Sequence, residues 1–114
     1  MSKAAIDRTT FENLKATTGA DFIGELVNTY LEDAPNLIAQ MHSALKVNDS
    51  ESFRRAAHSL KSNSATFGAG ALSELARELE MLGKENKLNE VGGRLKSVEE
   101  AFKVVSSELK GLVA

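Results

Sequence analysis

His58 and Lys61 are the residues of this chain whose types and spacing could support chemistry. They lie three residues apart in a segment with helical periodicity, so both side chains would project from the same side of a helix. At about 100° per residue, His58 falls roughly 160° from Leu60, the centre of the apolar stripe, and therefore faces solvent. A neutral exposed imidazole is a nucleophile, and an ammonium beside it can stabilise an anion attached to the ring, such as a phosphoryl group.

The surroundings of His58 favour a reactive role. Arg54, one turn earlier, would add a second cation, while the small residues Ser62 and Ala65 leave the approach to the ring open. Nearby cations disfavour the imidazolium, so the ring would be neutral near pH 7. The alternative is a solvated basic stripe that balances acidic helices. The other histidine, His42, projects to the edge of a buried face, and we interpret it as a partly exposed structural residue.

Other kinds of site lack the residues that they need. The chain has no cysteine, which excludes disulfides, thiolate catalysis and Cys-based zinc sites. A carboxylate-bridged metal site in a helical bundle requires Glu three residues before each histidine, but positions 39 and 55 hold Ala and Arg. The glycine-rich segment 68–70 lacks the lysine and the preceding strand of a phosphate-binding loop. The sequence therefore predicts neither a metal site nor a self-sufficient enzyme.

The composition is that of one globular domain. A chain of 114 residues with 42% hydrophobic and 26% charged residues can form one core, so we expect residues 1–114 to be a single domain. The net charge of −2, with only Arg54, Arg55 and Lys61 on the reactive helix, does not favour nucleic-acid or membrane binding. No apolar run approaches the roughly 20 residues of a membrane span, and no signal-peptide core is visible. We therefore expect a cytoplasmic protein.

The hydrophobic periodicity predicts helices throughout. A short helix over 10–16, with Thr9 and Glu12 at capping-box spacing, precedes four long ones over 22–46, 53–67, 70–82 and 91–112. Asp21 is the expected N-cap of the second, and the apolar phase continues across Pro35, which indicates a kink rather than a boundary. The last helix has the 4-3 spacing of a left-handed bundle. We predict an all-α, up-down-up-down four-helix bundle with an additional short N-terminal helix, monomeric because one bundle buries every stripe.

The stretch His58-Ser59-Leu60-Lys61-Ser62-Asn63-Ser64-Ala65-Thr66-Phe67-Gly68-Ala69 resembles the signature of histidine-containing phosphotransfer (HPt) domains, His-x-Leu-Lys-Gly-Ser-Ser-x-x-Leu/Ile-Gly-Ala. The resemblance extends to segments 22–35 and 75–82 and so covers most of the chain. It implies that His58 accepts a phosphoryl group through Nε2 and that Lys61 is the cation beside that group. The departure from the pattern is Ser62, where the family usually has glycine, a position that bears on docking and on the ring rotamer.

The resemblance also assigns structural positions in the motif. Leu60 is its inward-facing leucine, and Gly68 permits the helix to end and to pack closely. Ser64 matches the small polar residue on the inner side, where its hydroxyl is expected to bond to a backbone carbonyl one turn earlier.

The function implied by the resemblance is that of a phosphorelay intermediate in two-component signalling. His58 would accept a phosphoryl group from the phospho-aspartate of a response-regulator receiver domain and pass it to another receiver domain; a hybrid histidine kinase can also be a partner. The protein would be a phosphocarrier without autonomous catalytic activity and without a cofactor of its own, with Mg²⁺ expected on the partner receiver domain. Docking is expected to use four residues: Arg54, Ser62, Ala65 and Phe22.

Two points stay open at this stage. Phe22 lies beside the core stripe of its helix and can equally be buried. The alternative function is a non-catalytic helical interaction module that binds a receiver domain or a kinase without phosphotransfer. Such a module need not retain His58 and Lys61, so the intact pair argues against it.

Overall fold

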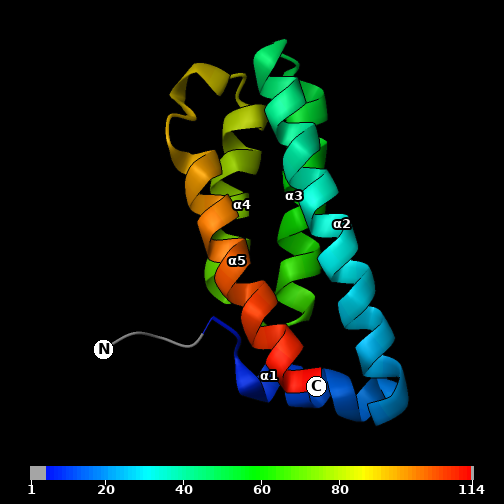
Figure 1. The fold of residues 1–114 in the computed structure, drawn as a ribbon. Coiled ribbons are helices and arrows are strands. Elements are labelled where there is room, and N and C mark those ends of the chain that lie inside the picture. Colours follow the sequence, from blue (N-terminus) through cyan, green and yellow to red (C-terminus); the bar gives the residue numbers. More distant parts are fainter. Residues whose placement is uncertain (1–4, 114) are drawn as a thin grey trace.

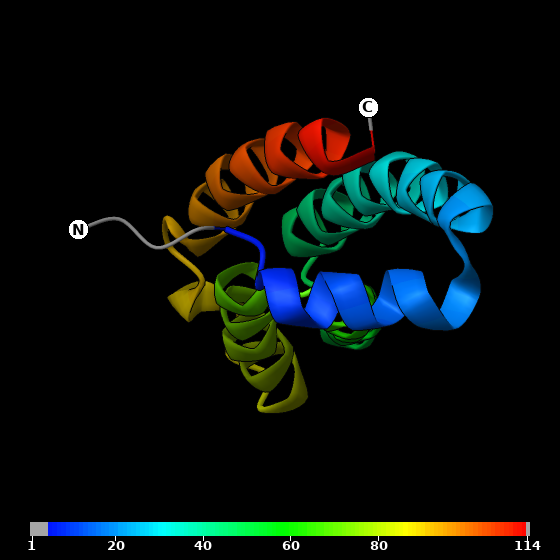
Figure 2. The ribbon, with the colours of Figure 1, turned by 90° about the horizontal axis from the view of Figure 1, so that it is seen from below.

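The computed structural model describes residues 5–113, which form five α-helices and one short 3-10 helix. The elements are α1 (Arg8–Thr18), α2 (Ala20–Lys46), α3 (Ser50–Thr66), α4 (Gly70–Lys84), η1 (Leu88–Glu90) and α5 (Arg94–Val113). Helices α2 to α5 run alternately up and down (Figure 1), and α1 lies across one end of the bundle (Figure 2). The predicted all-α bundle with a short N-terminal helix is confirmed.

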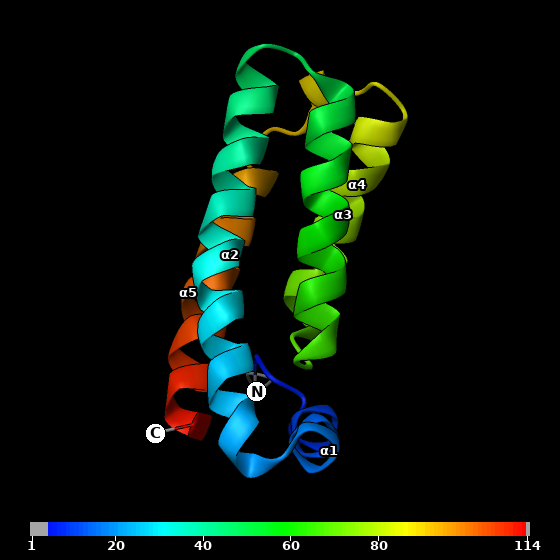
Figure 3. The ribbon, with the colours of Figure 1, turned by 90° about the vertical axis from the view of Figure 1, so that its right-hand side faces the viewer.

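The bundle is a ring of antiparallel neighbours in the order α2, α3, α4, α5, and α3 packs most extensively against α4 (Figure 3). Each helix turns its apolar stripe toward the shared core, as the periodicity predicts. Large side chains from every helix are fully buried there, among them Phe11, Met41, Phe53, Leu79, Val98 and Leu109. Helix α2 continues through Pro35 without interruption, as expected from its unbroken apolar phase.

The starts of the first two helices differ from the prediction. The Asp7 side chain caps α1, because its carboxylate accepts hydrogen bonds from the backbone N–H of Thr9 and Thr10 at 3.0 and 3.4 Å. The predicted cap, Thr9, is therefore already helical. In α2 the predicted cap Asp21 lies within the first turn, and the chain enters the helix through Gly19, whose φ is +98°. Asp7 lies two residues before Thr9 and accepts from the first free amides of the helix, so α1 begins earlier than predicted.

The connection between α4 and α5 begins and ends later in the chain than predicted. Helix α4 continues to Lys84, so Gly83 is helical and buried rather than part of a polar loop. Helix α5 begins at Arg94 instead of at 91, after Gly92 in a left-handed conformation with φ of +53°. Leu88 and Val91 are nevertheless buried, which continues the core beyond the helices.

An N-terminal segment, residues 5–7, ties the bundle end together. The backbone N–H groups of Ala5 and Ile6 donate to the Glu108 carboxylate at 2.9 and 3.1 Å, and Ile6 is buried. The Asp7 N–H donates to the Gly68 carbonyl at 2.8 Å. Gly68 has φ of +82°, and a Cβ there would lie 2.8 Å from the Asp7 carbonyl oxygen. Glycine at 68 thus permits both the end of α3 and the close passage of this segment.

Ser64 is the one fully buried polar residue among those described, and its partner differs from the prediction. Its hydroxyl lies 2.8 Å from the Tyr30 hydroxyl of α2, where the sequence suggested a backbone carbonyl. Burial raises the pKa of Tyr30 to about 12, although the Ser64 hydrogen bond acts in the opposite direction. The pair joins α2 to the motif-bearing α3 inside the core.

We expect Ser64→Ala to lower the free energy of unfolding by about 1–3 kcal/mol, because it leaves the buried Tyr30 hydroxyl without a partner. Tyr30→Phe should cost less, since the Ser64 hydroxyl can then turn to a backbone carbonyl of its own helix. Urea unfolding followed by circular dichroism measures both. Equal losses in the two variants would show that the pair does not act in this asymmetric way.

Candidate functional site

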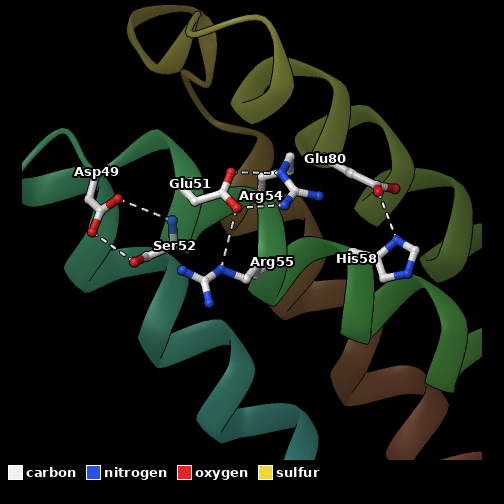
Figure 4. A network of polar contacts seen from close by, with 7 residues as sticks. All are labelled: Asp49, Glu51, Ser52, Arg54, Arg55, His58 and Glu80. Atoms are coloured by element: carbon white, nitrogen blue, oxygen red, sulfur yellow. Dashed lines mark hydrogen bonds and ion pairs between the residues drawn. The ribbon is translucent and has the colours of Figure 1, made fainter.

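The candidate site is centred on His58, in the middle of α3 on the side next to α4. Its side chain is 54% exposed, as predicted from the helical projection. The ring does not stand alone, because Nδ1 lies 2.7 Å from Oε2 of Glu80 on α4 (Figure 4). The Nδ1 edge of the imidazole is thus hydrogen-bonded to α4, while about half of the side chain remains exposed.

Glu80 also binds the second residue of the pair. Its other oxygen, Oε1, lies 2.7 Å from the Lys61 Nζ, so one carboxylate bridges the imidazole and the ammonium. The Glu80 side chain is only 15% exposed and that of Lys61 29%, which limits competition from water. The three residues form a continuous charged cluster on α3 and α4.

Glu80 remains ionised at neutral pH. Partial burial alone would raise its pKa, but hydrogen bonds from Lys61 and His58, and their charges, lower the pKa below the ordinary 4.5. A carboxyl group whose pKa is lower in the folded than in the unfolded chain stabilises the folded protein at any pH above the unfolded-state pKa. This stabilisation is lost as the pH falls through the folded-state pKa. The bridge is therefore complete at neutral pH and is lost only in acid.

The ionised carboxylate fixes the chemistry of the ring. A carboxylate only accepts hydrogen bonds, so the nitrogen that faces it, Nδ1, must carry the hydrogen. In a neutral imidazole the other nitrogen, Nε2, then has the free lone pair. Nε2 of His58 is accordingly the ring nitrogen that could act as a nucleophile, and the side chain that carries it is 54% exposed.

Arg54 does not leave a free cation beside the ring, contrary to the expectation of an open basic patch. Its guanidinium donates to both Glu51 oxygens, with Nε–Oε1 of 3.0 Å and Nη2–Oε2 of 2.7 Å (Figure 4). Arg55 lies 3.5 Å from the same carboxylate. The hydrogen bond from Arg54 lowers the pKa of Glu51. The cations around His58 thus have acidic partners, and the sequence argument based on cations alone was wrong on this point.

The structure places the other predicted residues as follows. Ser62 and Ala65 are exposed on the same side of α3 as His58, whereas Leu60, Ser64 and Gly68 are buried.

Phe22 is 49% exposed in the first turn of α2, near the end of the bundle where α1 lies, so it is not a core residue. The His42 side chain is 51% exposed, and its Nε2 lies 3.0 Å from Oε1 of Glu99 on α5.

Glu80 is the residue of the candidate site that the sequence analysis did not single out. It lies 22 positions after His58, and no helical spacing relates the two. The available signal was the segment 75–82, which shares in the family resemblance and contains an acidic residue flanked by the apolar stripe of α4.

Within residues 5–113, no group of three or more His, Cys, Asp or Glu side chains could hold a metal ion. None of the helices in this part of the chain is long and apolar enough to cross a membrane.

A helical bundle that presents one histidine with a free Nε2 has the form of a histidine phosphotransfer domain. The family model described as "Hpt domain" matches residues 25–113, and the chain belongs to this family. It is a phosphotransfer carrier with a role in a phosphorelay, the setting in which Hpt domains work with receiver domains and hybrid kinases.

Solved structures agree with this assignment. Histidine-containing phosphotransfer protein B (HptB) from Pseudomonas aeruginosa PAO1 is 25% identical to the chain, with a TM-score of 0.92 over 98% of this chain and 96% of that one. The HPT domain from a sensor hybrid histidine kinase of Shewanella shares the fold at 17% identity, with a TM-score of 0.78 over 96% and 94% of the two chains. No curated protein matches the chain.

Substitution of Glu80 tests the assignment of the ring tautomer. In Glu80→Gln the amide oxygen can still accept from Nδ1–H, so we expect this tautomer to remain the main one. In Glu80→Ala no acceptor remains, and both tautomers should be populated. Proton–nitrogen NMR correlation spectra of the imidazole ring report the tautomer directly. An Nε2–H tautomer in the wild-type protein would contradict the assignment.

Proposed function

We propose that His58 is the phosphoryl acceptor of this Hpt domain. It takes the group from the phospho-aspartate of a response-regulator receiver domain and passes it to the aspartate of another receiver. The observation that supports this role is the bond between Nδ1 and Glu80, which leaves Nε2 as the free nitrogen of an exposed side chain. His42, the other histidine, is exposed, but its Nε2 is engaged with Glu99, and the lysine nearest to it in α2, Lys46, follows after four residues rather than three.

The transfer step follows from this geometry. Nε2 attacks phosphorus, a nitrogen–phosphorus bond forms as the bond from phosphorus to the aspartate oxygen breaks, and the aspartate leaves as a carboxylate. No proton moves, because Nδ1 keeps its hydrogen. The phosphorylated ring then carries a positive charge next to Glu80, which stabilises it. In the onward step a receiver aspartate attacks phosphorus, and the neutral imidazole is the leaving group.

Lys61 supplies positive charge to the phosphoryl oxygens. In the free domain its ammonium lies 2.7 Å from Glu80, which keeps it next to the ring without a phosphoryl group present. Once the dianionic group arrives at Nε2, it offers further oxygen acceptors to the same ammonium. A charge-assisted hydrogen bond of this kind is about twice as strong as a neutral one.

The partner receiver domain supplies the rest of the chemistry. We expect Mg²⁺ to be bound there and the receiver to provide most of the transition-state stabilisation, so that this chain acts without autonomous catalytic activity. Placement in the cytoplasm and a monomeric state remain predictions.

The docking surface is proposed to lie on α3 around His58. Ser62 and Ala65 are exposed one and two turns after the histidine, on the same side, and small side chains there let a partner approach the ring. Arg54, paired with Glu51, would form part of the charged rim. Phe22, exposed at the start of α2, would contribute at the outer edge.

Phosphotransfer from a phosphorylated receiver domain tests the acceptor. We expect acid-labile, base-stable phosphate on the wild type and on His42→Gln, and none on His58→Gln. Lys61→Ala should slow transfer by about 10 to 100-fold, the equivalent of one lost charge-assisted hydrogen bond. Labelling of His58→Gln would overturn the assignment, and binding of the receiver without labelling of the wild type would support an interaction module instead.

A bulky residue at the docking surface should block the partner without unfolding the domain. We expect Ala65→Trp to weaken receiver binding by tenfold or more, about 1.4 kcal/mol. The control is Val104→Trp, because Val104 is also exposed but lies on α5. Calorimetric titration with an unphosphorylated receiver domain measures both. Equal affinity of the two variants would place the docking surface elsewhere.

A further inference from the structure

Glu80 reaches two residues of α3 because α3 and α4 pack closely, and Gly83 lies at a point of close approach between them. A Cβ built at Gly83 would lie 3.1 Å from the Cα, the Cβ and the backbone nitrogen of Arg54. Non-bonded carbon atoms in optimal contact are about 3.5–4.0 Å apart. Two of these three neighbours are backbone atoms, so a side chain at 83 requires one helix to move rather than a side chain to turn.

A second contact ties the same helices on the other side of the site. The Ser73 hydroxyl of α4 donates to the Lys61 carbonyl of α3 at 2.9 Å. Because the helices are antiparallel, Ser73 and Gly83 lie on either side of Glu80 along α4, opposite Lys61 and Arg54. The carboxylate therefore lies between two points at which the spacing of the helices is fixed.

The lack of space for a Cβ atom distinguishes Gly83 from other helical glycines. Gly24, Gly70 and Gly111 would each accept a Cβ with no heavy atom within 4 Å outside their own helix. Gly83 does not have the positive φ found at Gly68, so its backbone conformation is open to any residue. Conformation thus does not require glycine at 83, whereas the contact with Arg54 does.

We propose that Gly83 is a positioning residue of the phosphotransfer site. It touches neither the ring nor the lysine, but it admits α4 close enough to α3 for Glu80 to lie 2.7 Å from both His58 Nδ1 and Lys61 Nζ. A larger residue moves α4 outward by a few tenths of an ångström at 83, one turn from Glu80, and lengthens both contacts. This inference rests on the proposed role of His58.

The direct test compares Gly83→Ala with Gly70→Ala, a matched substitution in the same helix. We expect Gly83→Ala to populate the second ring tautomer in NMR spectra. It should also slow phosphotransfer by about threefold to tenfold, since a full 1 Å misplacement can cost about 10²-fold. Gly70→Ala should change neither. A folded Gly83→Ala domain with an unchanged tautomer and rate would overturn the proposal.

A double-variant cycle separates positioning from general packing. If Gly83 acts through Glu80, then Gly83→Ala should slow transfer no further in a Glu80→Ala background. Independent effects that multiply would overturn the proposal, because a packing defect does not depend on the carboxylate. The ring spectra do not depend on which residue is phosphorylated, so they test Gly83 even if His58→Gln were to retain transfer.

Glu80→Asp tests the same distance if Gly83→Ala does not fold. The shorter side chain withdraws the carboxylate by one methylene group and leaves the contact between α3 and α4 unchanged. We expect the altered tautomer and the slower transfer that Gly83→Ala would give. Wild-type behaviour of Glu80→Asp would overturn the proposal, because the close approach of the helices would then be unnecessary.

Discussion

One carboxylate that serves two side chains is the interaction on which the site depends. Glu80 can bridge His58 and Lys61 only if α4 returns antiparallel to α3 in one register and at short range. The turn at Gly68, the Ser73 bond to the Lys61 carbonyl and the contact at Gly83 all serve that register. Because the carboxylate is ionised and only accepts hydrogen bonds, the register of two helices decides which nitrogen of an imidazole is nucleophilic.

The parts of this protein that the sequence predicts are those encoded by local spacing. Helices and their buried faces follow from a repeat of 3.6 residues, and the residues buried in the core are those that this repeat predicts. The exposure of His58 and its proximity to Lys61 follow from positions three apart on one helix. The family signature is local for the same reason, since a dozen consecutive residues in one register contain His58, Lys61 and Gly68, the glycine that ends the helix.

The parts that could not be predicted depend on contacts between segments or on competition between neighbours. Glu80 and Gly83 gain their importance only from the crossing of α3 and α4, which no single helix specifies. Ser64 could bond within its own helix, and the arrival of Tyr30 from α2 decided otherwise. Thr9 was expected to cap α1, but the Asp7 carboxylate caps it instead. Arg54 competes for neither His58 nor a partner protein as a free cation, because Glu51 of the same helix binds its guanidinium.

The N-terminal segment has a consequence for the order in which the molecule is completed. Its amides bind a glutamate more than 100 positions later, at separations of 102 and 103 residues. Such contacts close a very long loop, and the entropy lost on closure opposes them until other contacts have formed. The contact between α3 and α4 closes a far shorter loop, because His58 and Glu80 are 22 positions apart. The two helices that carry this pair can therefore associate early in folding, before the N-terminal segment seals the end of the bundle.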